Sequence, residues 1–487
     1  MIRLKGKDRG LIVASNRLPF RRKKARKNGF IWEKSAGGLI TAMEPILTDV
    51  KGTWLGWDGH TASIPGDEAP ELIDVKEIAS AENSGNKDGR SYYIGCVPLD
   101  SREYDEYYNR LSNGALWGLF HYFFEKSYID QSCWKTYLKV NERFASYIDK
   151  TAAEEDIIWI HDFHLFMTPY FLRRMRPDQE IHFFLHTPFP HIDIFSILPW
   201  QDQILESLLS CDTVGFHHRQ YLENFKGAVK TYLKEERKAG GNTNISDLNS
   251  RFYYNPISID FKLLDITSRK PEVIQRKNEI IKQTGCPKLI LGVDRIDYSK
   301  GIKERLLGLE MLLDKRPELK ESFFYYQLVI PSRELVGSYK ILKKQIDEII
   351  GRLNGKFAAG LWAPVYYRYG TVPFEELVAL YSAADIALVT PLRDGMNLVC
   401  KEYVASRSDG DGVLILSKFT GAIAEIKNCL AVNPYSIEGV SDAIYEALTM
   451  PEKERRKRMK RMRTNIEKNN ILNWLHKCVE HFEKSDR

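Results

Sequence analysis

The fold is decided by one stretch, PLRDGMNLVCKEYVAS, which runs from Pro391 to Ser406. The residues before it, 385–390, form a short and nearly continuous apolar run, which is typical of a strand buried on both faces of a parallel sheet. From Val399 onward, apolar residues recur at helical spacing. We therefore predict a strand-to-helix turn in which Gly395 permits the sharp backbone and Asn397 caps the helix.

The predicted turn has the chemistry of an anion-binding site. Its free backbone N–H groups and the positive end of the helix dipole point to one place, where a negative charge gains about 0.3–2 kcal/mol. Asp394 lies at the mouth of the turn, and Glu402 falls in the second helical turn. Either residue alone would also fit a structural loop, but the whole stretch favours a ligand site.

The length and composition indicate a globular protein with more than one domain. A chain of 487 residues suits two or three domains, and its 43% hydrophobic content is typical of a folded chain. No apolar run approaches the ~20 residues of a membrane helix. Charged residues near the N-terminus occupy the place of a signal-peptide core, so we expect a cytoplasmic protein that does not bind a membrane.

The charge, the cysteines and the histidines argue against a nucleic-acid-binding protein, a disulfide framework and a metal site. The net charge of +6 suits small anionic substrates and is weaker than that of typical nucleic-acid-binding proteins. The seven cysteines contain no CxxC pair, so we expect neither a disulfide framework nor a zinc site. His161, His164, His182 and His186 lack a paired carboxylate that would complete a metal site. Of the two histidines on the strand 180–186, His182 is expected to be buried in mid-sheet and only His186 would reach the rim. We therefore expect no metal and no cofactor.

Strand-like runs alternate with helical patterns along the chain, which predicts an α/β fold with parallel sheets. Several of these runs end in a polar residue, at the edge where open α/β sheets bind ligands. The predicted strands cover residues 10–15, 156–161, 180–186, 211–216, 288–294, 327–333, 365–369, 385–390 and 412–417. A polar segment between Phe261 and Glu272 is the predicted linker between two halves.

The first half contains a second phosphate cradle. Arg17 follows the first predicted strand, a basic run from Arg21 to Lys27 is expected to be a loop, and Gly38 opens a predicted helix over residues 39–47. The pattern contains neither the GxGxxG of dinucleotide-binding folds nor the GxxxxGK[ST] of P-loops. It therefore does not indicate NAD chemistry or ATP hydrolysis.

The second half contains a pair of cations after the predicted strand 288–294. Arg295 and Lys300 lie five positions apart, and Gly301 begins the next helix. A guanidinium binds two phosphate oxygens in a fork, and an ammonium adds a mobile point charge. This spacing favours a diphosphate site, with a solvated loop as the alternative.

These motifs together resemble the trehalose-6-phosphate synthase family of retaining, nucleotide-sugar-dependent glycosyltransferases. The resemblance extends from Leu11 to about Trp474. It implies the GT-B architecture, in which two Rossmann-like domains with parallel sheets face each other across a cleft. The implied parts are an acceptor-binding domain over residues 1–262, a nucleotide-sugar-binding domain over residues 263–465, and a C-terminal helix, residues 466–487, that crosses back to the first domain.

The resemblance also assigns roles to residues of this sequence. The implied donor-binding residues are Gly38, Arg295, Lys300, Asp394, Gly395, Met396, Asn397, Leu398 and Glu402. The implied acceptor-binding residues are Arg17, Trp57, Tyr108, Trp117, Asp162 and Arg333. The implied catalytic residues are Asp162, His186, Arg295, Lys300 and Asp394. The acceptor phosphate would lie among Arg17, Tyr108 and Arg333, and the nucleotide ribose would lie on Glu402.

The implied reaction moves glucose from a nucleoside diphosphate glucose to glucose 6-phosphate with retention, giving α,α-trehalose 6-phosphate. We find no carboxylate in the sequence that could act as a nucleophile, and the family is thought to let the departing diphosphate take the acceptor's proton. UDP, ADP and GDP remain alternative nucleotides. The expected partners are these small substrates, with no nucleic acid and no membrane, and a homo-oligomer is compatible with the sequence.

Three alternative functions stay open. The segment HTPFPHIDIFSILPW, from His186 to Trp200, is equally similar to glucosylglycerol-phosphate synthases, which use glycerol 3-phosphate, although the PSR that ends at Arg333 favours the trehalose branch. A pseudo-glycosyltransferase acting on cyclitols is a second alternative. A catalytically silent sugar-phosphate sensor is the third, but the donor-site charges that such proteins lose are intact here. No phosphatase motif of the DxDxT type follows, so we expect no fused phosphatase.

Overall fold

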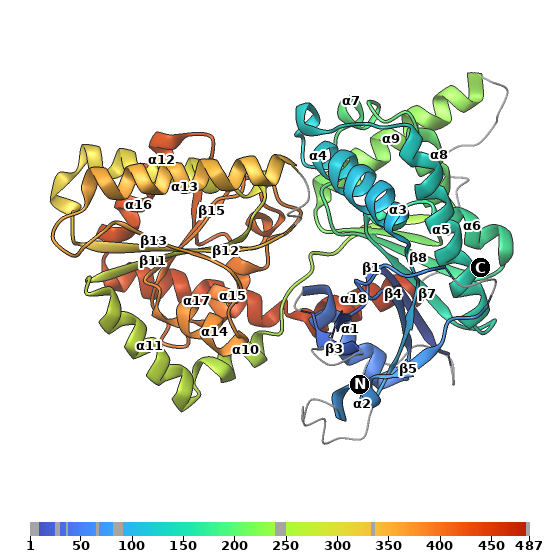
Figure 1. Ribbon diagram of the computed structural model, residues 1–487, viewed down its shortest axis with the longest axis horizontal. Helices are drawn as coiled ribbons and strands as arrows, with labels where there is room; N and C mark the ends of the chain where they lie inside the picture. The colour runs from blue at the N-terminus through green and yellow to red at the C-terminus, as the bar shows by residue number, and fades with distance from the viewer. Residues whose placement is uncertain are drawn as a thin grey trace. The chain divides into compact units, whose positions relative to one another are not determined.

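The computed structural model describes residues 9–24, 30–35, 38–64, 68–80, 91–238, 250–332 and 337–483. The chain divides into two compact units, each built around a mainly parallel β-sheet (Figure 1). Unit 1 comprises Met1–Ile257 and Trp474–Arg487, and unit 2 comprises Ser258–Asn473. The α/β fold class expected from the sequence is thereby confirmed.

The segment predicted to be an interdomain linker is helical instead. Helix α10 (Phe261–Ser268) and the start of α11 (Pro271–Thr284) occupy it. Asp260 caps α10 by accepting a hydrogen bond from the Leu263 amide at 2.9 Å, and Pro271 stands at the first position of α11, where its missing N–H costs nothing. The polar composition that suggested a linker therefore belongs to helix α10, which Asp260 caps, and to the start of α11, which begins at Pro271.

Unit 1 contains an eight-stranded sheet with the order β10-β9-β8-β7-β1-β4-β6-β5. Neighbouring strands are parallel, except that β5 is antiparallel to β6. The inner strands are buried along both faces, which explains their continuous apolar sequences. The strands are β1 (Leu11–Arg17), β4 (Thr53–Trp57), β5 (Leu72–Asp74), β6 (Tyr93–Cys96), β7 (Ile157–His161), β8 (Glu180–Leu185), β9 (Thr213–Phe216) and β10 (Arg251–Tyr254).

The basic run expected to be a loop forms part of a hairpin. Strands β2 (Phe20–Lys24) and β3 (Phe30–Lys34) pair antiparallel, while residues 25–29 lie outside the described part of the chain. Across the hairpin, Arg21 Nε donates to Glu33 at 2.7 Å, and the Arg22 guanidinium lies 5.1 Å from the centre of the Trp32 ring. These cross-strand pairs neutralise or cover the cations, so a basic sequence can form a strand here.

Ten α-helices and one π-helix are described in unit 1. They are α1 (Gly38–Val50), α2 (Val75–Ser80), α3 (Ser101–Glu103), α4 (Trp117–Phe120), α5 (Ser132–Thr151), α6 (Thr168–Met175), α7 (Ile192–Phe195), α8 (Gln201–Leu209), α9 (Arg219–Lys238) and, across the boundary with unit 2, α18 (Ile471–Glu483), together with the wider π-helix η1 (Tyr104–Leu116). Short 3₁₀ turns are η2 (Phe124–Lys126) and η3 (Phe163–Leu165).

The C-terminal helix α18 contributes to the core of unit 1. Trp474 stacks on Trp159 of β7 with ring centroids 5.5 Å apart, and Phe482 stacks on His182 of β8 at 3.8 Å. Asn255 donates to the Trp474 carbonyl at 2.9 Å. These buried contacts join residues far apart in sequence and fix α18 against the sheet.

Unit 2 contains a six-stranded, fully parallel sheet with the order β13-β12-β11-β14-β15-β16. Its strands are β11 (Lys288–Arg295), β12 (Phe323–Ile330), β13 (Val365–Tyr369), β14 (Ile386–Val389), β15 (Val413–Ser417) and β16 (Leu430–Val432). The remaining helices are α12 (Ile302–Lys315), α13 (Gly337–Phe357), α14 (Phe374–Ala383), α15 (Val399–Ser406), α16 (Ile437–Thr449) and α17 (Glu452–Lys468), with 3₁₀ turns η5 (Tyr298–Lys300), η6 (Pro317–Leu319) and η7 (Gly421–Ala424). Helices α12 and α13 cover one face, and α10, α11, α14 and α17 the other (Figure 1).

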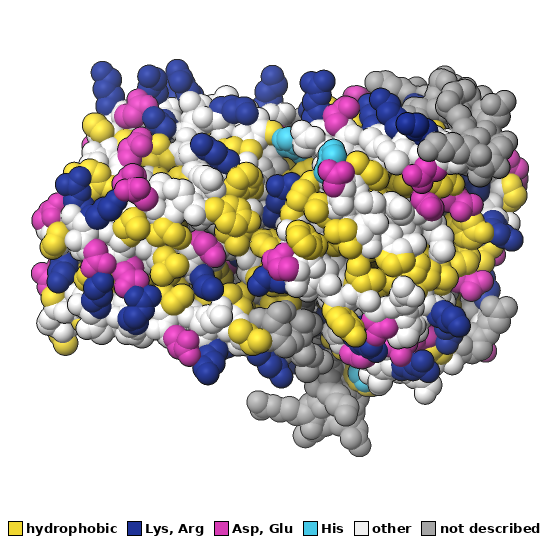
Figure 2. All heavy atoms as spheres, turned by 90° about the horizontal axis from the view of Figure 1, so that it is seen from above, with side chains coloured by type: hydrophobic (Ala, Val, Ile, Leu, Met, Phe, Trp, Pro, Cys, Tyr) yellow, Lys and Arg dark blue, Asp and Glu magenta, His cyan; other side chains and the backbone are white. Residues whose placement is uncertain are grey.

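Lys and Arg side chains are spread over the face shown in Figure 2 and interleave with acidic ones, without a continuous basic stripe. No helix in the described ranges is long and apolar enough to cross a membrane. All seven cysteines are unpaired thiols.

Candidate active site

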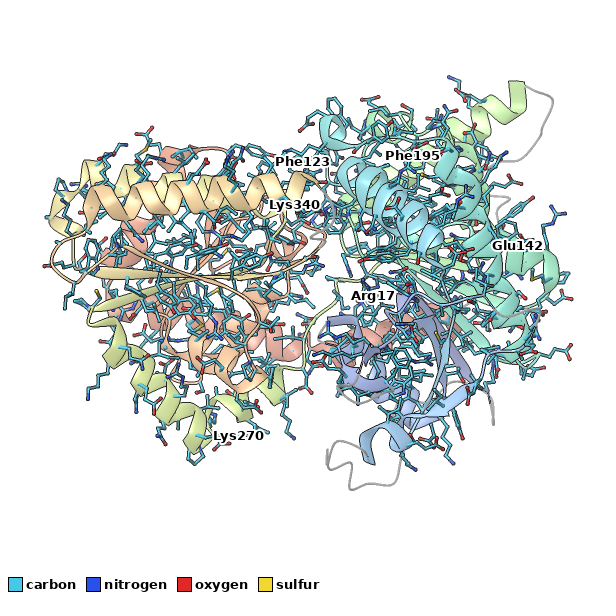
Figure 3. The ribbon with its side chains drawn as sticks, viewed as in Figure 1. Arg17, Phe123, Glu142, Phe195, Lys270 and Lys340 are labelled. Atoms are coloured by element: carbon cyan, nitrogen blue, oxygen red, sulfur yellow. The ribbon has the colours of Figure 1, made fainter. Side chains whose placement is uncertain are left out.

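The sheet of unit 1 carries sequence-predicted site residues at the carboxyl ends of four strands. Arg17 ends β1 (Figure 3), Trp57 ends β4, Asp162 follows β7 and His186 follows β8. Because β7, β1 and β4 are adjacent and parallel, their carboxyl ends share one edge of the sheet.

Arg17 is held against two aromatic rings. Its guanidinium carbon lies 4.9 Å from the centre of the Trp57 ring and 5.1 Å from that of Tyr108. The ring of Tyr104 stacks on that of Tyr108 with centroids 5.4 Å apart, and its centroid lies 5.0 Å from that of the Trp57 ring. A cation over aromatic faces keeps its full charge and its N–H donors, so this arrangement orients Arg17 for an anion.

The wide helix η1 places Tyr108 beside Arg17. Tyr107 is buried and its hydroxyl donates to Asn16 at 2.9 Å, while Asn113 donates to the Tyr108 carbonyl at 2.8 Å. These bonds anchor the inward face of the helix, which leaves Tyr104 and Tyr108 together on the other face. π-Helical turns are frequent at functional sites.

A cavity of about 420 Å³ opens beside this cluster. It is lined by Arg17, Trp57, Gly59, His60, Thr61, Ser101 and Tyr104. The β2–β3 hairpin is attached to its rim, because Phe30 packs against His60 at 4.7 Å and Arg22 pairs with Asp58 at 3.1 Å. Sequence reasoning missed Tyr104, although its position four residues before Tyr108 placed it on the same face of a helix.

Trp117 lies one layer away from the Arg17 cluster. The centroid of its ring lies 4.0 Å from that of His121 and 6.0 Å from that of Phe163. The ring centroids of Phe163 and His164 are 4.0 Å apart. His164 in turn stacks on Tyr108 at 5.8 Å. Trp117 therefore joins the predicted acceptor residues through two intermediate rings.

Asp162 adopts a strained backbone. Its φ of 73° is in the left-handed region, which costs a non-glycine residue roughly 1–3 kcal/mol. The Asp162 amide donates to the Phe184 carbonyl at 2.9 Å, and its carboxylate accepts from the His186 amide at 3.3 Å. This conformation aims the peptide and the carboxylate of Asp162 at the sheet edge, a use of strain typical of functional sites.

The four histidines of β7 and β8 do not form a metal site. His182 is buried in mid-strand, where it contacts Thr213 and Glu180, each at 2.8 Å, as expected. His186 reaches the edge and is partly exposed there, and its Nε2 lies 3.0 Å from His161 Nδ1. Burial lowers the pKa of His186 to about 3, so its ring is neutral. Among the residues that the structure describes, no group of three His, Cys, Asp or Glu is placed to hold a metal ion.

In unit 2 the two predicted donor-binding turns are bonded to each other. Lys300 Nζ donates to Asp394 Oδ2 at 2.6 Å, and Asn397 donates to the same oxygen at 3.1 Å. The Leu392 amide donates to the Ser299 carbonyl at 2.7 Å. Both side chains of the Lys300–Asp394 pair are largely buried, so they are presented in a fixed geometry.

The conformation of the second turn differs from the prediction in two respects. The left-handed residue is Asn397, with φ 70°, and the described glycines with positive φ do not include Gly395. The helix cap position belongs to Leu398, while the Asn397 side chain accepts from the Cys400 amide at 3.3 Å. Asn tolerates this region because its amide bonds locally. Met396 is buried, and its backbone carbonyl accepts from Ala422.

Glu402 lies in the first turn of α15, one turn earlier than predicted. The Tyr381 hydroxyl donates to its Oε2 at 2.8 Å. Burial raises the pKa of Glu402, and the Tyr381 bond opposes this shift. The neighbouring Lys401 is buried and pairs with Glu425 at 2.6 Å.

Arg305 of α12 is a site residue that the sequence did not reveal. Its side chain is fully buried and donates to Asp294 at 2.6 Å, Gln327 at 3.0 Å and Thr390 at 3.1 Å. It also donates to the Lys300 carbonyl at 3.3 Å. Arg305 thus ties the Lys300 turn to three strands. No local signal could have shown this, because its partners come from separate strands.

Arg295 and Arg333 complete the predicted set. Arg295 ends β11 with an exposed side chain. Arg333 lies outside the described residues, and Gly38 begins α1 directly after undescribed residues. At Gly301, φ is 65° and a Cβ would collide with the Thr390 carbonyl, so this turn requires glycine.

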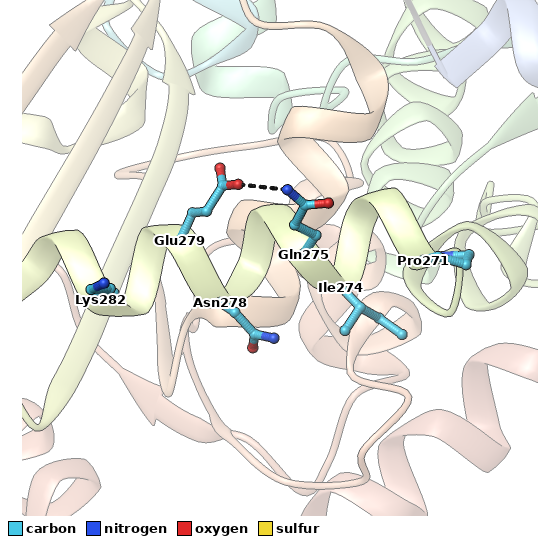
Figure 4. Close-up of a pocket in the computed structure, with 6 residues that line it drawn as sticks. All are labelled: Pro271, Ile274, Gln275, Asn278, Glu279 and Lys282. Atoms are coloured by element: carbon cyan, nitrogen blue, oxygen red, sulfur yellow. Dashed lines mark hydrogen bonds between the residues drawn. The ribbon is translucent and has the colours of Figure 1, made fainter.

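A second hollow, of about 600 Å³, runs along one side of α11 (Figure 4). It is lined by Pro271, Ile274, Gln275, Asn278, Glu279 and Lys282. All of these residues come from a single helix, and Gln275 already donates to Glu279 at 3.1 Å. Without polar groups converging from a second element, this surface lacks the features of a binding site.

Comparisons with known proteins identify the family of the chain. A model of glycosyltransferase family 20 matches residues 9–484. The trehalose-6-phosphate synthase of Mycobacterium leprae (strain TN) is 39% identical over 476 residues, which cover 96% of this chain and 93% of the relative. The Mycobacterium ulcerans (strain Agy99) enzyme of the same name is 38% identical over 96% of this chain and 92% of its own.

Solved structures of GT-B proteins show the same fold. An α,α-trehalose-phosphate synthase (UDP-forming) from Burkholderia xenovorans, solved with glucose-6-phosphate, is similar with a TM-score of 0.84 and 30% identity over 98% of this chain and all of the other. An E. coli protein bound with UDP-2-fluoro glucose is similar with a TM-score of 0.82 and 33% identity over 96% and 97% of the two chains. The family expected from the sequence is therefore confirmed, and the chain belongs to glycosyltransferase family 20.

Proposed function

We propose that this protein is an α,α-trehalose-phosphate synthase, which transfers glucose from UDP-glucose to glucose 6-phosphate with retention and so forms α,α-trehalose 6-phosphate. The observation that carries the proposal is the 39% identity to a trehalose-6-phosphate synthase over 96% of the chain. Glucose-6-phosphate in the B. xenovorans protein supports the acceptor, and UDP-2-fluoro glucose in the E. coli protein supports a uridine donor.

The acceptor phosphate binds at Arg17 and Tyr108 in this proposal. The guanidinium is held on two rings beside a cavity of about 420 Å³ that opens to its N–H donors. Arg–phosphate bonds are charge-assisted and bidentate, which suits a hexose phosphate dianion. Trp57 and Trp117 supply aromatic faces for the sugar, Asp162 accepts from its hydroxyl groups, and Arg333 adds a second guanidinium.

The donor binds to the paired turns of unit 2. Lys300 and Arg295 hold the diphosphate, with Gly38 as a further phosphate contact, and Asp394 accepts from glucose hydroxyl groups. The Lys300–Asp394 bond of 2.6 Å supports this role because it holds both groups in place before the substrate arrives. Backbone groups of Gly395, Met396, Asn397 and Leu398 line the start of α15, and Glu402 accepts from the ribose.

Transfer proceeds on one face of the glucose ring. The bond from the anomeric carbon to the diphosphate oxygen breaks, a bond to the acceptor's anomeric hydroxyl oxygen forms on the same face, and the acceptor proton moves to the departing diphosphate. A nucleophilic carboxylate is not required. The ring of His186 is neutral and bonded within the protein, so His186 acts by position rather than as an acid or base. The protein contributes orientation and charge stabilisation.

A product assay tests this proposal. UDP-, ADP- and GDP-glucose would each be offered with glucose 6-phosphate or glycerol 3-phosphate, and the products followed by NMR of the anomeric protons. We expect α,α-trehalose 6-phosphate from UDP-glucose and glucose 6-phosphate. Preference for glycerol 3-phosphate would overturn the proposal in favour of a glucosylglycerol-phosphate synthase, and substrate binding without turnover would identify a sensor.

A further inference from the structure

Three histidine rings in unit 1 form a continuous hydrogen-bonded chain. His161, His186 and His217 stand at the carboxyl ends of the adjacent parallel strands β7, β8 and β9. His161 Nδ1 lies 3.0 Å from His186 Nε2, and His186 Nδ1 lies 3.2 Å from His217 Nε2. The Ile257 amide contacts His217 Nδ1 at 3.4 Å.

A single backbone amide sets the direction of this chain. The Ile257 N–H can only donate, so His217 Nδ1 accepts and the proton of the neutral ring is on Nε2. That proton is donated to His186 Nδ1, which places the His186 proton on Nε2, facing His161 Nδ1. All three rings are therefore Nε2–H tautomers. A second proton on His186 would oppose the N–H of His217, so the arrangement requires neutral rings.

The chain ends at the candidate active site. Both nitrogens of the partly exposed His186 ring are bonded within the protein, one to His161 and the other to His217, and its backbone amide bonds at the sheet edge. The His186 amide donates to the Asp162 carboxylate at 3.3 Å. Asp162 has the strained φ of 73° and is the residue proposed to accept from substrate hydroxyl groups. A displaced His186 ring would move both the His186 backbone and the Asp162 carboxylate.

We propose that His217 is a positioning residue for glucosyl transfer, which orients the His186 backbone and the Asp162 carboxylate through the directed histidine chain. This inference rests on the proposed function. His217 touches neither substrate, and its effect passes through the His186 ring. His161 supports the opposite side of the same ring, where its Nδ1 accepts the His186 proton.

The test compares two substitutions of His217 with a matched control. In His217→Phe the ring volume is kept and the Nε2–H donor is lost, so we expect kcat to fall about tenfold, the effect of one hydrogen bond. The Kd for UDP should stay within about twofold, because the turns of unit 2 are untouched. The KM for glucose 6-phosphate should rise by less than kcat falls, because the Arg17 cluster that binds the phosphate is untouched and only the Asp162 contact to the sugar is displaced. His217→Gln presents an N–H near the Nε2 position and should restore most of kcat.

His182→Phe is the control for a purely structural effect. His182 is equally buried on β8, but its partners are Thr213 and Glu180. This variant should lower the melting temperature while kcat, measured well below that temperature, stays near the wild-type value. Equal losses of kcat in His182→Phe and His217→Phe, or no loss in a folded His217→Phe protein, would overturn the proposal.

NMR of the wild-type protein provides a second measurement that does not depend on a folded variant. Long-range ¹H–¹⁵N correlation of labelled histidines should show the Nε2–H tautomer for all three rings, and His217→Gln should preserve that of His186. An Nδ1–H tautomer of His186 would refute the chain. Wild-type protein that makes no trehalose 6-phosphate would instead refute the proposed function, so the two failures are distinguishable.

Discussion

The carboxyl edges of the two sheets are stabilised by opposite kinds of interaction. In unit 1 the edge is built mainly from rings, with the histidine chain on one side and Arg17 held on aromatic faces on the other. In unit 2 the edge is built from buried ion pairs, Lys300 with Asp394 and Arg305 with Asp294. The difference indicates where each edge is vulnerable. Removing one residue of an ion pair in unit 2 leaves its partner as a buried charge. In unit 1, protonation of the neutral histidine chain would introduce a charge.

The largest expected effect comes from breaking the most buried ion pair. Arg305→Leu would leave Asp294 without its cation, and such a loss costs about 3–5 kcal/mol. We expect a large decrease in the urea midpoint of unit 2, with partial recovery in the double variant Arg305→Leu/Asp294→Asn. Arg455→Leu is the matched control, because Arg455 also binds an aspartate, Asp411, at 2.8 Å but is partly exposed. It should cost roughly 1 kcal/mol or less, and equal costs would contradict the comparison.

The second prediction concerns catalysis by the ion pair that faces the donor. Lys300→Ala removes the cation proposed to stabilise the departing diphosphate, so kcat should fall by about two to three orders of magnitude. Lys303→Ala removes the same charge at the second residue of α12 and should leave kcat unchanged. Steady-state kinetics of the two variants provide the measurement. Near-normal turnover in a folded Lys300→Ala protein would remove Lys300 from the proposed donor site.

The third prediction addresses the cation of the neutral edge. Arg17→Ala should raise the KM for glucose 6-phosphate roughly ten- to a hundredfold, because a charge-assisted bond contributes about 1.5–3 kcal/mol. The Kd for UDP, measured by calorimetry, should be unchanged because the proposed donor residues other than Gly38 lie in unit 2. Lys23→Ala, on the adjacent hairpin, is the control with the same loss of charge. An unchanged KM would show that the cluster does not bind the acceptor.

The sequence predicted the features that are local in the chain. The strand, turn and helix around residues 385–406 were visible because buried strands and amphipathic helices have distinct periods. Asp394 lies in this turn, and Lys300 lies in a second turn of the same kind, after the predicted strand 288–294. Within the turn, the sequence did not determine which residue takes positive φ, since Gly395 and Asn397 both tolerate it, and the structure places it at Asn397.

Other features depend on strand order, which no short motif contains. His161, His186 and His217 become neighbours only because β7, β8 and β9 are adjacent in the sheet. From the sequence alone, Arg305 cannot be distinguished from an arginine on the exposed face of a helix, because its partners Asp294 and Gln327 come from separate strands. The β2–β3 hairpin was hidden because its alternating residues are nearly all basic. The π-helical width of η1 likewise has no sequence signal that we can identify.

The last prediction is a difference in acid sensitivity between the two edges. Burial lowers the pKa of His186 to about 3, and burial with the adjacent His186 lowers that of His161 well below its ordinary value. Below pH 6.5 the unfolded histidines bind protons that the folded ones do not, so stability falls with falling pH, by up to about 1.4 kcal/mol per pH unit for each histidine.

In unit 2, the pKa of Glu402 is raised by burial. Acidification therefore increases the contribution of Glu402 to the free energy of unfolding. The Arg455 bond lowers the pKa of Asp411 to about 2. The contribution of this ion pair to stability is therefore lost only below the ordinary range for aspartate.

Hydrogen exchange at pH 7 and pH 5, corrected for intrinsic rates, should therefore show protection lost from β7, β8 and β9 while β11 and β14 keep theirs. Equal losses in both sheets would show that the neutral edge is not the acid-sensitive one.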